Sequence, residues 1–193
     1  MARAKEFDPD EALQSALELF WARGYEATSM SDLVAHLGIA KASIYGTFGG
    51  KRELYAKAMR RYLELTDPKI VEELSGPGPV LPSVRGLVER FIGEAAGDER
   101  HWGCMVVNTA VEMADRDPEL ARLVESSWSN LETALTSALL RARAQGELSE
   151  SADPRALARL LLVFFQGVRV LARTADPGVR LRDASRVLLA LLS

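Results

Sequence analysis

Small polar and positively charged side chains gather in the window from Ser29 to Lys51. On a helix beginning at Lys41 they fall on one side, whereas Ile44 and Phe48, spaced four apart, fall on the other and anchor the helix to a core. Ammonium and hydroxyl groups bind phosphate oxygens, and small side chains let a helix backbone approach base edges. The expected nucleic-acid-binding residues are Ser29, Ser31, Lys41, Ala42, Ser43, Tyr45, Gly46, Thr47 and Lys51.

Two short helices and a glycine turn are expected to position this surface. Ser29 and Asp32 have the spacing of a capping box, in which each side chain accepts a backbone N–H, so a helix begins there. Gly38 stands where a residue with positive φ ends a helix at low cost, and the turn Gly38-Ile39-Ala40 follows. A second helix is expected over about 41–48. This order is typical of a helix-turn-helix, whose second helix enters the major groove.

Flanking residues extend the pattern to a domain-sized window. Phe20-x-x-x-Gly24-Tyr25 precedes the two helices, and Lys51-Arg-Glu-Leu54 follows them. With these residues, roughly a third of the chain resembles the N-terminal domain of the TetR/AcrR family of bacterial repressors. The resemblance implies a dimer that binds a palindromic operator in double-stranded DNA and leaves it when a small-molecule effector binds the other domain.

Two positions depart from the family pattern. Ala40 stands where the family often has a serine that caps the recognition helix, and Gly46-Thr47 replace a common aromatic-histidine pair. Alanine provides no cap, and a glycine inside a helix costs about 1 kcal/mol relative to alanine. We therefore expect a recognition helix that stays loose until DNA orders it, with a base preference that does not carry over from relatives.

Composition restricts the classes of protein that fit this chain. Its 193 residues are 48% apolar and 26% charged, as in ordinary globular proteins. The apolar runs are too short to span a bilayer and the first residues lack a secretory signal, so we expect no membrane partner and a cytoplasmic location. The single cysteine, Cys104, excludes an internal disulfide, and His36 and His101 lie far apart, so we expect no metal and no cofactor.

The local charge near the expected recognition helix differs from the net charge of −3. Between residues 41 and 61 six cations accompany one acid, Glu53, which predicts a basic surface there. Arg3 and Lys5 either add phosphate or minor-groove contacts, as homeodomain arms do, or merely solvate the terminus. The six cations are Lys41, Lys51, Arg52, Lys57, Arg60 and Arg61.

Helix signals continue outside this window. A first helix is expected from Asp8-Pro9 to Gly24, because aspartate caps helices and proline fits the first helical position. A linker helix is expected from Lys51 towards Pro68, and the glycine- and proline-rich segment 75–82 is expected not to be helical. The predicted domains are a helix-turn-helix domain, 1–65, and a larger helical regulatory and dimerisation domain, 66–193.

The second domain is expected to contain helices throughout. Its Asp-Pro pairs mark helix starts, and no segment shows sustained strand-like alternation, so the predicted fold class is all-α. The expected ranges are about 83–97, 103–114, 117–145, 153–174 and 179–192.

The last two predicted helices are apolar on more than one side. A second copy of the chain would bury the surplus, which predicts a homodimer through these helices and two recognition helices about one turn of DNA apart. Burial within one chain is the alternative. The apolar residues are Leu157, Leu160, Leu161, Val163, Phe164, Val168 and Leu171, then Val187, Leu188, Leu189, Leu191 and Leu192.

Aromatic, sulfur and amide side chains are candidates for a ligand pocket in the second domain, because such pockets are mostly apolar with a few polar groups. Each of them could equally belong to the core. Cys104 begins a predicted helix, where a thiol ionises more readily, and the Gly103-Cys104 pair resembles one in family members that sense electrophiles or oxidants. An inert buried thiol is the alternative. The candidates are Trp102, Cys104, Met105, Asn108, Met113, Trp128 and Phe165.

These features together predict a DNA-binding transcriptional regulator, expected to be a repressor released by a small molecule. A thiol-based sensor that acts through Cys104 on the same DNA-binding domain is the alternative. A helical enzyme would need a convergent acid, base or nucleophile, and His101 is too close in sequence to Cys104 for an obvious dyad, so no catalytic residue is assigned. A helical adaptor that binds protein through the apolar C-terminal helices is a further alternative, and the basic cluster beside the expected recognition helix argues against it.

Overall fold

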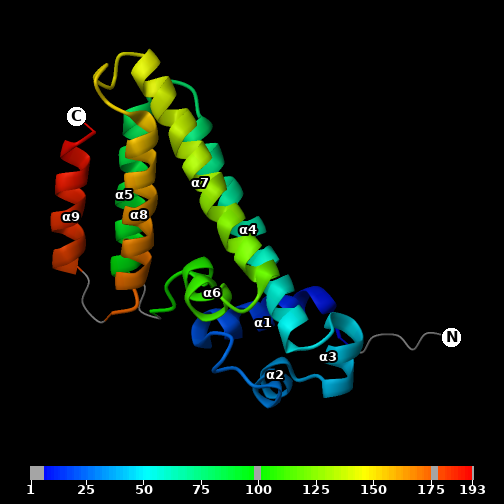
Figure 1. The fold of residues 1–193 in the computed structure, drawn as a ribbon. Coiled ribbons are helices and arrows are strands. Elements are labelled where there is room, and N and C mark those ends of the chain that lie inside the picture. Colours follow the sequence, from blue (N-terminus) through cyan, green and yellow to red (C-terminus); the bar gives the residue numbers. More distant parts are fainter. Residues whose placement is uncertain (1–6, 98–100, 175–177, 193) are drawn as a thin grey trace.

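Helices form all the regular secondary structure in the part of the chain that the computed structural model describes, residues 7–97, 101–174 and 178–192. The predicted all-α fold is therefore confirmed. In Figure 1, α1 to α3 gather at one end of the molecule, α5, α8 and α9 lie at the other, and the long helices α4 and α7 run between them. The helices are α1 (Pro9–Arg23), α2 (Met30–Leu37), α3 (Lys41–Phe48), α4 (Lys51–Ser75), α5 (Val80–Gly97), α6 (Met105–Met113), α7 (Pro118–Ala144), α8 (Pro154–Leu171) and α9 (Gly178–Ala190).

Asp-Pro pairs begin α1, α7 and α8, as the sequence indicates. The Asp8 carboxylate accepts the Asp10 N–H at 2.8 Å, and Asp117 and Asp153 each accept two N–H groups from the first turn of their helices. These bonds satisfy donors that have no partner inside a helix. The predicted cap at Asp176-Pro177 lies outside the described residues.

The linker helix α4 is longer than predicted, because it continues through Pro68 to Ser75. Proline inside a helix removes one hydrogen bond and costs about 3 kcal/mol. Beyond the proline, Ile70 and Leu74 are buried against α5 and α7 in the larger core. The apolar burial that these two side chains gain offsets the local cost of Pro68.

The glycine- and proline-rich segment 75–82 is only partly non-helical, which corrects the prediction. Helix α5 begins at Val80, so Pro82 lies in its first turn, where a missing N–H breaks no hydrogen bond. The Glu147 carboxylate, from beyond the end of α7, accepts the N–H groups of Val80 at 2.8 Å and Leu81 at 2.9 Å. A side chain distant in the sequence therefore caps this helix.

The described helices pack around two hydrophobic cores. The smaller end is built from α1 to α3 and the first half of α4, but α6 and the start of α7 also contribute Met105, Leu120 and Val124 to it. The other core joins α5, α8 and α9 to the far halves of α4 and α7. The predicted domain border between residues 65 and 66 falls inside the continuous α4. One continuous helix therefore belongs to both cores.

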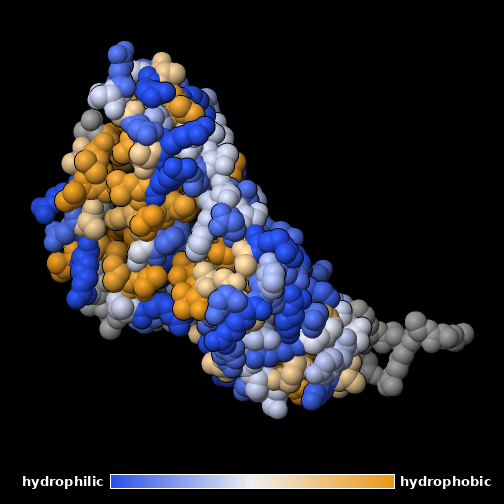
Figure 2. Space-filling model, viewed as in Figure 1, coloured by the Kyte–Doolittle hydropathy of each residue, from blue (hydrophilic) through white to orange (hydrophobic). Residues whose placement is uncertain are grey.

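The outer faces of α8 and α9 carry apolar side chains that the rest of the described chain does not cover. Val163 is 68% exposed and Val187 62%, whereas Phe165 and Leu188 on the inner faces are buried. In Figure 2, apolar side chains gather over the end that holds α8 and α9, and the opposite end is mostly polar. None of the described helices has the length and hydropathy that a membrane crossing requires. The exposed apolar residues are Leu160, Val163 and Val170 of α8, Val179 and Val187 of α9, and Leu191, which directly follows α9.

Candidate DNA-binding surface and ligand cavity

The predicted helix-turn-helix is formed by α2 and α3. The Ser29 hydroxyl oxygen accepts the Asp32 N–H at 3.1 Å and the Asp32 carboxylate accepts the Ser29 N–H at 2.8 Å, which completes the capping box. Gly38 ends α2 with φ of 67°, a left-handed conformation that favours glycine. Ile44 and Phe48 then anchor α3, since both are buried.

The polar side of α3 faces away from this core. Lys41, Ala42, Tyr45 and Gly46 are exposed, and Ser43 and Thr47 are half-buried. Ser29 and Ser31 at the start of α2 are also exposed, and Lys51 begins α4 with its ammonium 4.0 Å from the centroid of the Tyr25 ring. The nine predicted residues therefore lie around one small-residue helix and two helix N-termini, an arrangement that suits phosphate and base-edge contacts.

The recognition helix has the two weak points that its sequence indicates. Ala40 occupies the N-cap of α3 and makes no side-chain capping bond. A Cβ built on Gly46 would meet no atom within 4 Å, so no packing requires glycine at this position. The packing of its two buried anchors must therefore supply stability that a side-chain cap would otherwise add.

The basic surface is narrower than predicted, because four of the six cations are bound within the chain. Acids at the start of α7 lie across α4 and hold two of them, and Lys41 and Lys51 remain beside the recognition helix. Arg3 and Lys5 lie outside the described residues. The partners are Asp117 and Glu119 for Arg52, Glu119 for Arg60, the Phe48 carbonyl for Lys57 and Gln14 for Arg61.

Helix α6 and the start of α7 clamp the helix-turn-helix to the rest of the molecule. The Glu112 carboxylate accepts the N–H of Tyr25 at 2.8 Å, in the turn between α1 and α2. Arg52 binds Asp117 through two parallel hydrogen bonds of 2.7 and 2.9 Å, which lower the pKa of Asp117 to about 2. The Tyr55 hydroxyl shares a 2.8 Å hydrogen bond with Thr109. These contacts join α6 to the turn after α1 and join α4 to α6 and α7.

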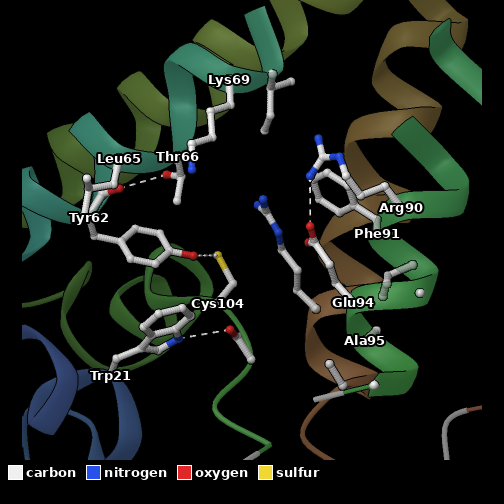
Figure 3. A pocket seen from close by; sticks show the side chains of 17 residues that line it. Trp21, Tyr62, Leu65, Thr66, Lys69, Arg90, Phe91, Glu94, Ala95 and Cys104 are labelled. Atoms are coloured by element: carbon white, nitrogen blue, oxygen red, sulfur yellow. Dashed lines mark hydrogen bonds and ion pairs between the residues drawn. The ribbon is translucent and has the colours of Figure 1, made fainter. Parts of the chain in front are cut away.

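A cavity of about 930 Å³ lies further along α4, between this helix, α5, α8 and the segment before α6. Figure 3 shows Trp21 and Tyr62 on one side of it and Phe91, Arg90 and Glu94 on the other. Its volume is in the range of sites for organic molecules. The cavity residues on α4 are Tyr62, Leu65, Thr66, Lys69 and Ile70.

Two family models match the chain, one at each end. Residues 12–58 match the model of bacterial regulatory proteins of the tetR family, and residues 80–188 match the tetracyclin repressor-like C-terminal domain. The chain belongs to the TetR family. It is a helix-turn-helix transcriptional regulator, as the motif between Ser29 and Lys51 predicts.

Relatives match over most or all of the length of this TetR-family chain. The uncharacterized HTH-type transcriptional regulator YezE of Bacillus subtilis is 40% identical over 193 residues, 100% of both chains. The HTH-type transcriptional repressor ComR of Escherichia coli is 29% identical over 176 residues, 89% of this chain and 82% of ComR. A cysteine mutant of the TetR-family regulator CifR, complexed with 26-base-pair operator DNA, has a TM-score of 0.85 at 26% identity, with 98% of each chain covered.

The predicted pocket residues of this TetR-family chain occupy several environments, and among them Cys104 lines the large cavity. Met105 and Phe165 are fully buried, and Met113 belongs to the core beneath the helix-turn-helix. The buried Asn108 donates its side-chain amide to the Trp102 carbonyl at 3.2 Å. Trp128 lines a separate small hollow beside Asp67.

Sequence reasoning missed most of the cavity wall, which comes from α4, α5 and α8. Phe91 and Arg169 are an example, since they lie in different helices and the guanidinium carbon of Arg169 lies 4.7 Å from the centroid of the Phe91 ring. Amphipathic periodicity identifies the inner face of each helix, but not which inner faces leave space between them. The sequence signal that could have indicated the cavity wall is the occurrence of arginine and lysine near aromatic residues on these three helices.

Cys104 lies at the start of α6, at the wall of the cavity. Its thiol is buried, and the Tyr62 hydroxyl donates to its sulfur at 3.6 Å (Figure 3). Burial raises the pKa of Tyr62 well above its ordinary value, so this hydroxyl keeps its proton. The sulfur therefore faces a neutral donor rather than a base.

Proposed function

We propose that this TetR-family regulator is a dimeric repressor that binds a palindromic operator and is released by a small molecule in the cavity. One observation carries the proposal: α4 bears Lys51 at the DNA-binding end and Tyr62, Leu65 and Lys69 in the cavity wall. ComR is named a transcriptional repressor, and CifR was solved with operator DNA, which supports the same mode of action here.

On DNA, we expect α3 to enter the major groove and the N-termini of α2 and α4 to bind phosphates. We expect Lys41 and Ser43, an exposed and a half-buried residue of α3, to approach base edges. The expected phosphate ligands are Ser29, Ser31, Tyr45 and Lys51, and Ala42, Gly46 and Thr47 complete the contact surface.

The dimer would form through the exposed apolar faces of α8 and α9. Apolar surface of this kind on a soluble chain marks a protein contact, and a two-fold contact pairs each patch with its own copy. The pairing sets two copies of α3 at neighbouring grooves.

In this scheme residues 1–65 bind DNA, and residues 66–193 bind the ligand and the second copy. The protein works in the cytoplasm, where the chromosome is.

Release would follow from a shift between two arrangements of α4. A ligand that wedges α4 away from α5 and α8 favours an arrangement in which the two recognition helices no longer match adjacent grooves. The clamp formed by Glu112, Asp117 and Arg52 would carry α6 and α7 along with the same movement. Ligand and operator then weaken each other's binding by the same factor.

A mobility-shift titration with genomic fragments, followed by footprinting of the bound fragment, tests this function. We expect a salt-sensitive complex with one class of fragment and a protected palindrome. A Lys41→Ala, Lys51→Ala double variant should lose the complex, whereas Arg143→Ala, at the other end of the molecule, should keep it. Absence of any sequence-dependent complex would refute the proposal.

Thiol sensing through Cys104 is the second candidate, because Cys104 is among the residues that line the cavity. N-ethylmaleimide should then alkylate the native protein and release the operator, and Cys104→Ser should retain the operator in the presence of the reagent. If the native thiol resists the reagent, or if alkylation leaves operator affinity unchanged, the sulfur is only a packing group.

A further inference from the structure

We propose that the large cavity takes an organic carboxylate with an aromatic or branched apolar body. The proposal names the chemical class of the small molecule that releases the repressor. It rests on the proposed function only for the effect of this ligand on operator binding. The feature that decides the charge of the ligand is Arg169 of α8, which lines the cavity.

The apolar body of the ligand follows from the aromatic side chains in the wall. The Trp21 and Tyr62 rings pack edge to face with centroids 5.0 Å apart, and Phe91 lies across the cavity (Figure 3). Trp21 already donates its indole N–H to the Gly103 carbonyl at 3.0 Å, and Tyr62 donates to Cys104. Because the polar atoms of both side chains are already bonded, the rings offer the ligand mainly apolar contact.

The carboxylate follows from the state of the Arg169 guanidinium. Its central carbon lies 4.7 Å from the centroid of the Phe91 ring, which holds the group by a cation–π contact. Within the described residues, neither a carboxylate at ion-pair distance nor a hydrogen-bond acceptor is found for it. Asp67, which Arg169 influences electrostatically, accepts hydrogen bonds from Ser127 at 3.3 Å and Thr66 at 3.5 Å. A half-buried guanidinium with open donors matches a carboxylate through two parallel hydrogen bonds.

The other charged groups around the cavity are Arg90, Glu94 and Lys69. Arg90 binds Glu73 at 2.8 Å and Glu94 at 3.0 Å, so it has no free charge for a ligand, and this arginine with its two acids carries a net charge of −1. Lys69 also lines the cavity, and among the described residues no acid lies within ion-pair distance of its ammonium. A cationic ligand would be repelled by Lys69 and Arg169, neither of which forms an ion pair among the described residues, although Asp67 reduces the positive potential at Arg169. An anionic ligand would neutralise one of them and gain from the field of the other.

Isothermal titration calorimetry of the full-length protein with 2-naphthoate and 2-naphthamide tests the proposal, because the two probes share a ring system and differ in charge. We expect 2-naphthoate to bind at least about tenfold more tightly, the gain of one charge-assisted bond. Arg169→Gln should remove this difference and leave the affinity for the amide unchanged. Arg159→Gln is the matched control, on the same helix but paired with Glu132 outside the cavity.

Three results would overturn the proposal: equal affinity for both probes, an equal loss of both in Arg169→Gln, or no heat from 2-naphthoate at millimolar concentration. Thermal unfolding of each variant verifies its fold. If Arg169→Gln does not fold, Lys69→Gln is tested in its place, because an exposed side chain can be replaced with little effect on folding. This substitution should also lower the affinity for the anion, but by a smaller factor.

A mobility shift with the footprinted operator separates this proposal from the proposed function. If 2-naphthoate binds in an Arg169-dependent manner but leaves the operator complex intact, the carboxylate site stands and ligand release fails. If 2-naphthamide releases the operator as well as 2-naphthoate does, ligand release stands and the carboxylate proposal fails.

Discussion

Single carboxylates join the DNA-binding end of this regulator to its larger half. Glu112 binds the backbone of Tyr25, so it holds the turn before α2 without depending on the side chain there. Asp117 has two tasks, since it caps α7 and also binds Arg52 of α4. Removal of either acid would leave its hydrogen-bond donors without an acceptor. The loss of stability from such unsatisfied donors usually exceeds the net contribution of the bond itself.

Asp117 makes the fold sensitive to acid. Its pKa is lowered from 3.8 to about 2, so the native state holds the ionised form more strongly than the unfolded chain does. This contribution to stability is present above about pH 4 and is lost as the pH falls through the native pKa. We expect Asp117→Asn to lower the melting temperature at neutral pH and to flatten its decline between about pH 4 and pH 2.

The matched control for that prediction is Asp115→Asn, because Asp115 is exposed and three-quarters of its side chain faces solvent. Asp32 and Glu119 also have lowered pKa values, through Ser29 and Arg52 respectively, so the decline in acid should be reduced rather than abolished. An unchanged acid profile in Asp117→Asn would show that the Arg52 contact contributes nothing to folding.

Lys51 and Lys41 should affect operator binding differently. Lys51 begins α4, and we expect it to bind phosphate, so Lys51→Gln should weaken binding to all sequences alike and lower the slope of log affinity against log salt by about one per subunit. Lys41→Gln, on α3, should change the preference between operator variants. Fluorescence anisotropy across a salt series and a panel of mutated operators measures both effects. A sequence-dependent effect at Lys51 would contradict this assignment.

At the scale of elements, α3 is stabilised less than its neighbours. It lacks a cap at Ala40 and contains Gly46, which no packing requires. Gly46→Ala should raise the free energy of unfolding by about 0.5–1 kcal/mol and the melting temperature by a few degrees. Gly38→Ala should instead destabilise, because φ at Gly38 is 67°. Differential scanning calorimetry distinguishes the two, and a destabilised Gly46→Ala would mean that α3 needs its flexibility in the free protein.

Helix α4 connects the DNA-binding surface to the cavity because it is one unbroken element. It runs from Lys51 through Pro68 to Ser75, packs against α1 at one end, and contributes to both cores. A rigid helix passes a displacement along its length, whereas a hinge at residue 65 would absorb it. In the proposed function, the continuity of α4 would let a ligand beside Leu65 displace Lys51.

At the scale of the whole molecule, the exposed apolar faces of α8 and α9 predict the assembly. Val163→Glu would place a charge in the dimer interface, so we expect a dimeric mass for the natural chain and a monomeric mass for the variant. Val111→Glu is the control, since Val111 is 77% exposed but lies on α6. Analytical ultracentrifugation measures both masses, and a Val163→Glu dimer would place the interface elsewhere.

Local sequence was sufficient for the features that depend on neighbours in the chain. The capping box of Ser29 and Asp32, the left-handed Gly38 and the Asp117 and Asp153 caps involve groups within a few residues of each other. Their hydrogen bonds require little beyond the local backbone, so residue type and spacing predict them. Burial of Ile44 and Phe48 follows in the same way from helical periodicity.

Only the tertiary structure decided which distant groups meet. Glu147 caps α5 from 67 residues away, and packing carries α4 through Pro68 against local propensity. Asp117 removes Arg52 from the basic surface, and the cavity wall combines α4, α5 and α8. These contacts depend on how whole helices pack, and packing is set by many weak apolar contacts summed over the core rather than by any one motif. The sequence by itself determined the helix-turn-helix in which α3 is the expected DNA-contacting helix, and the packing determined which charges stay unpaired beside α3 and which side chains line the cavity.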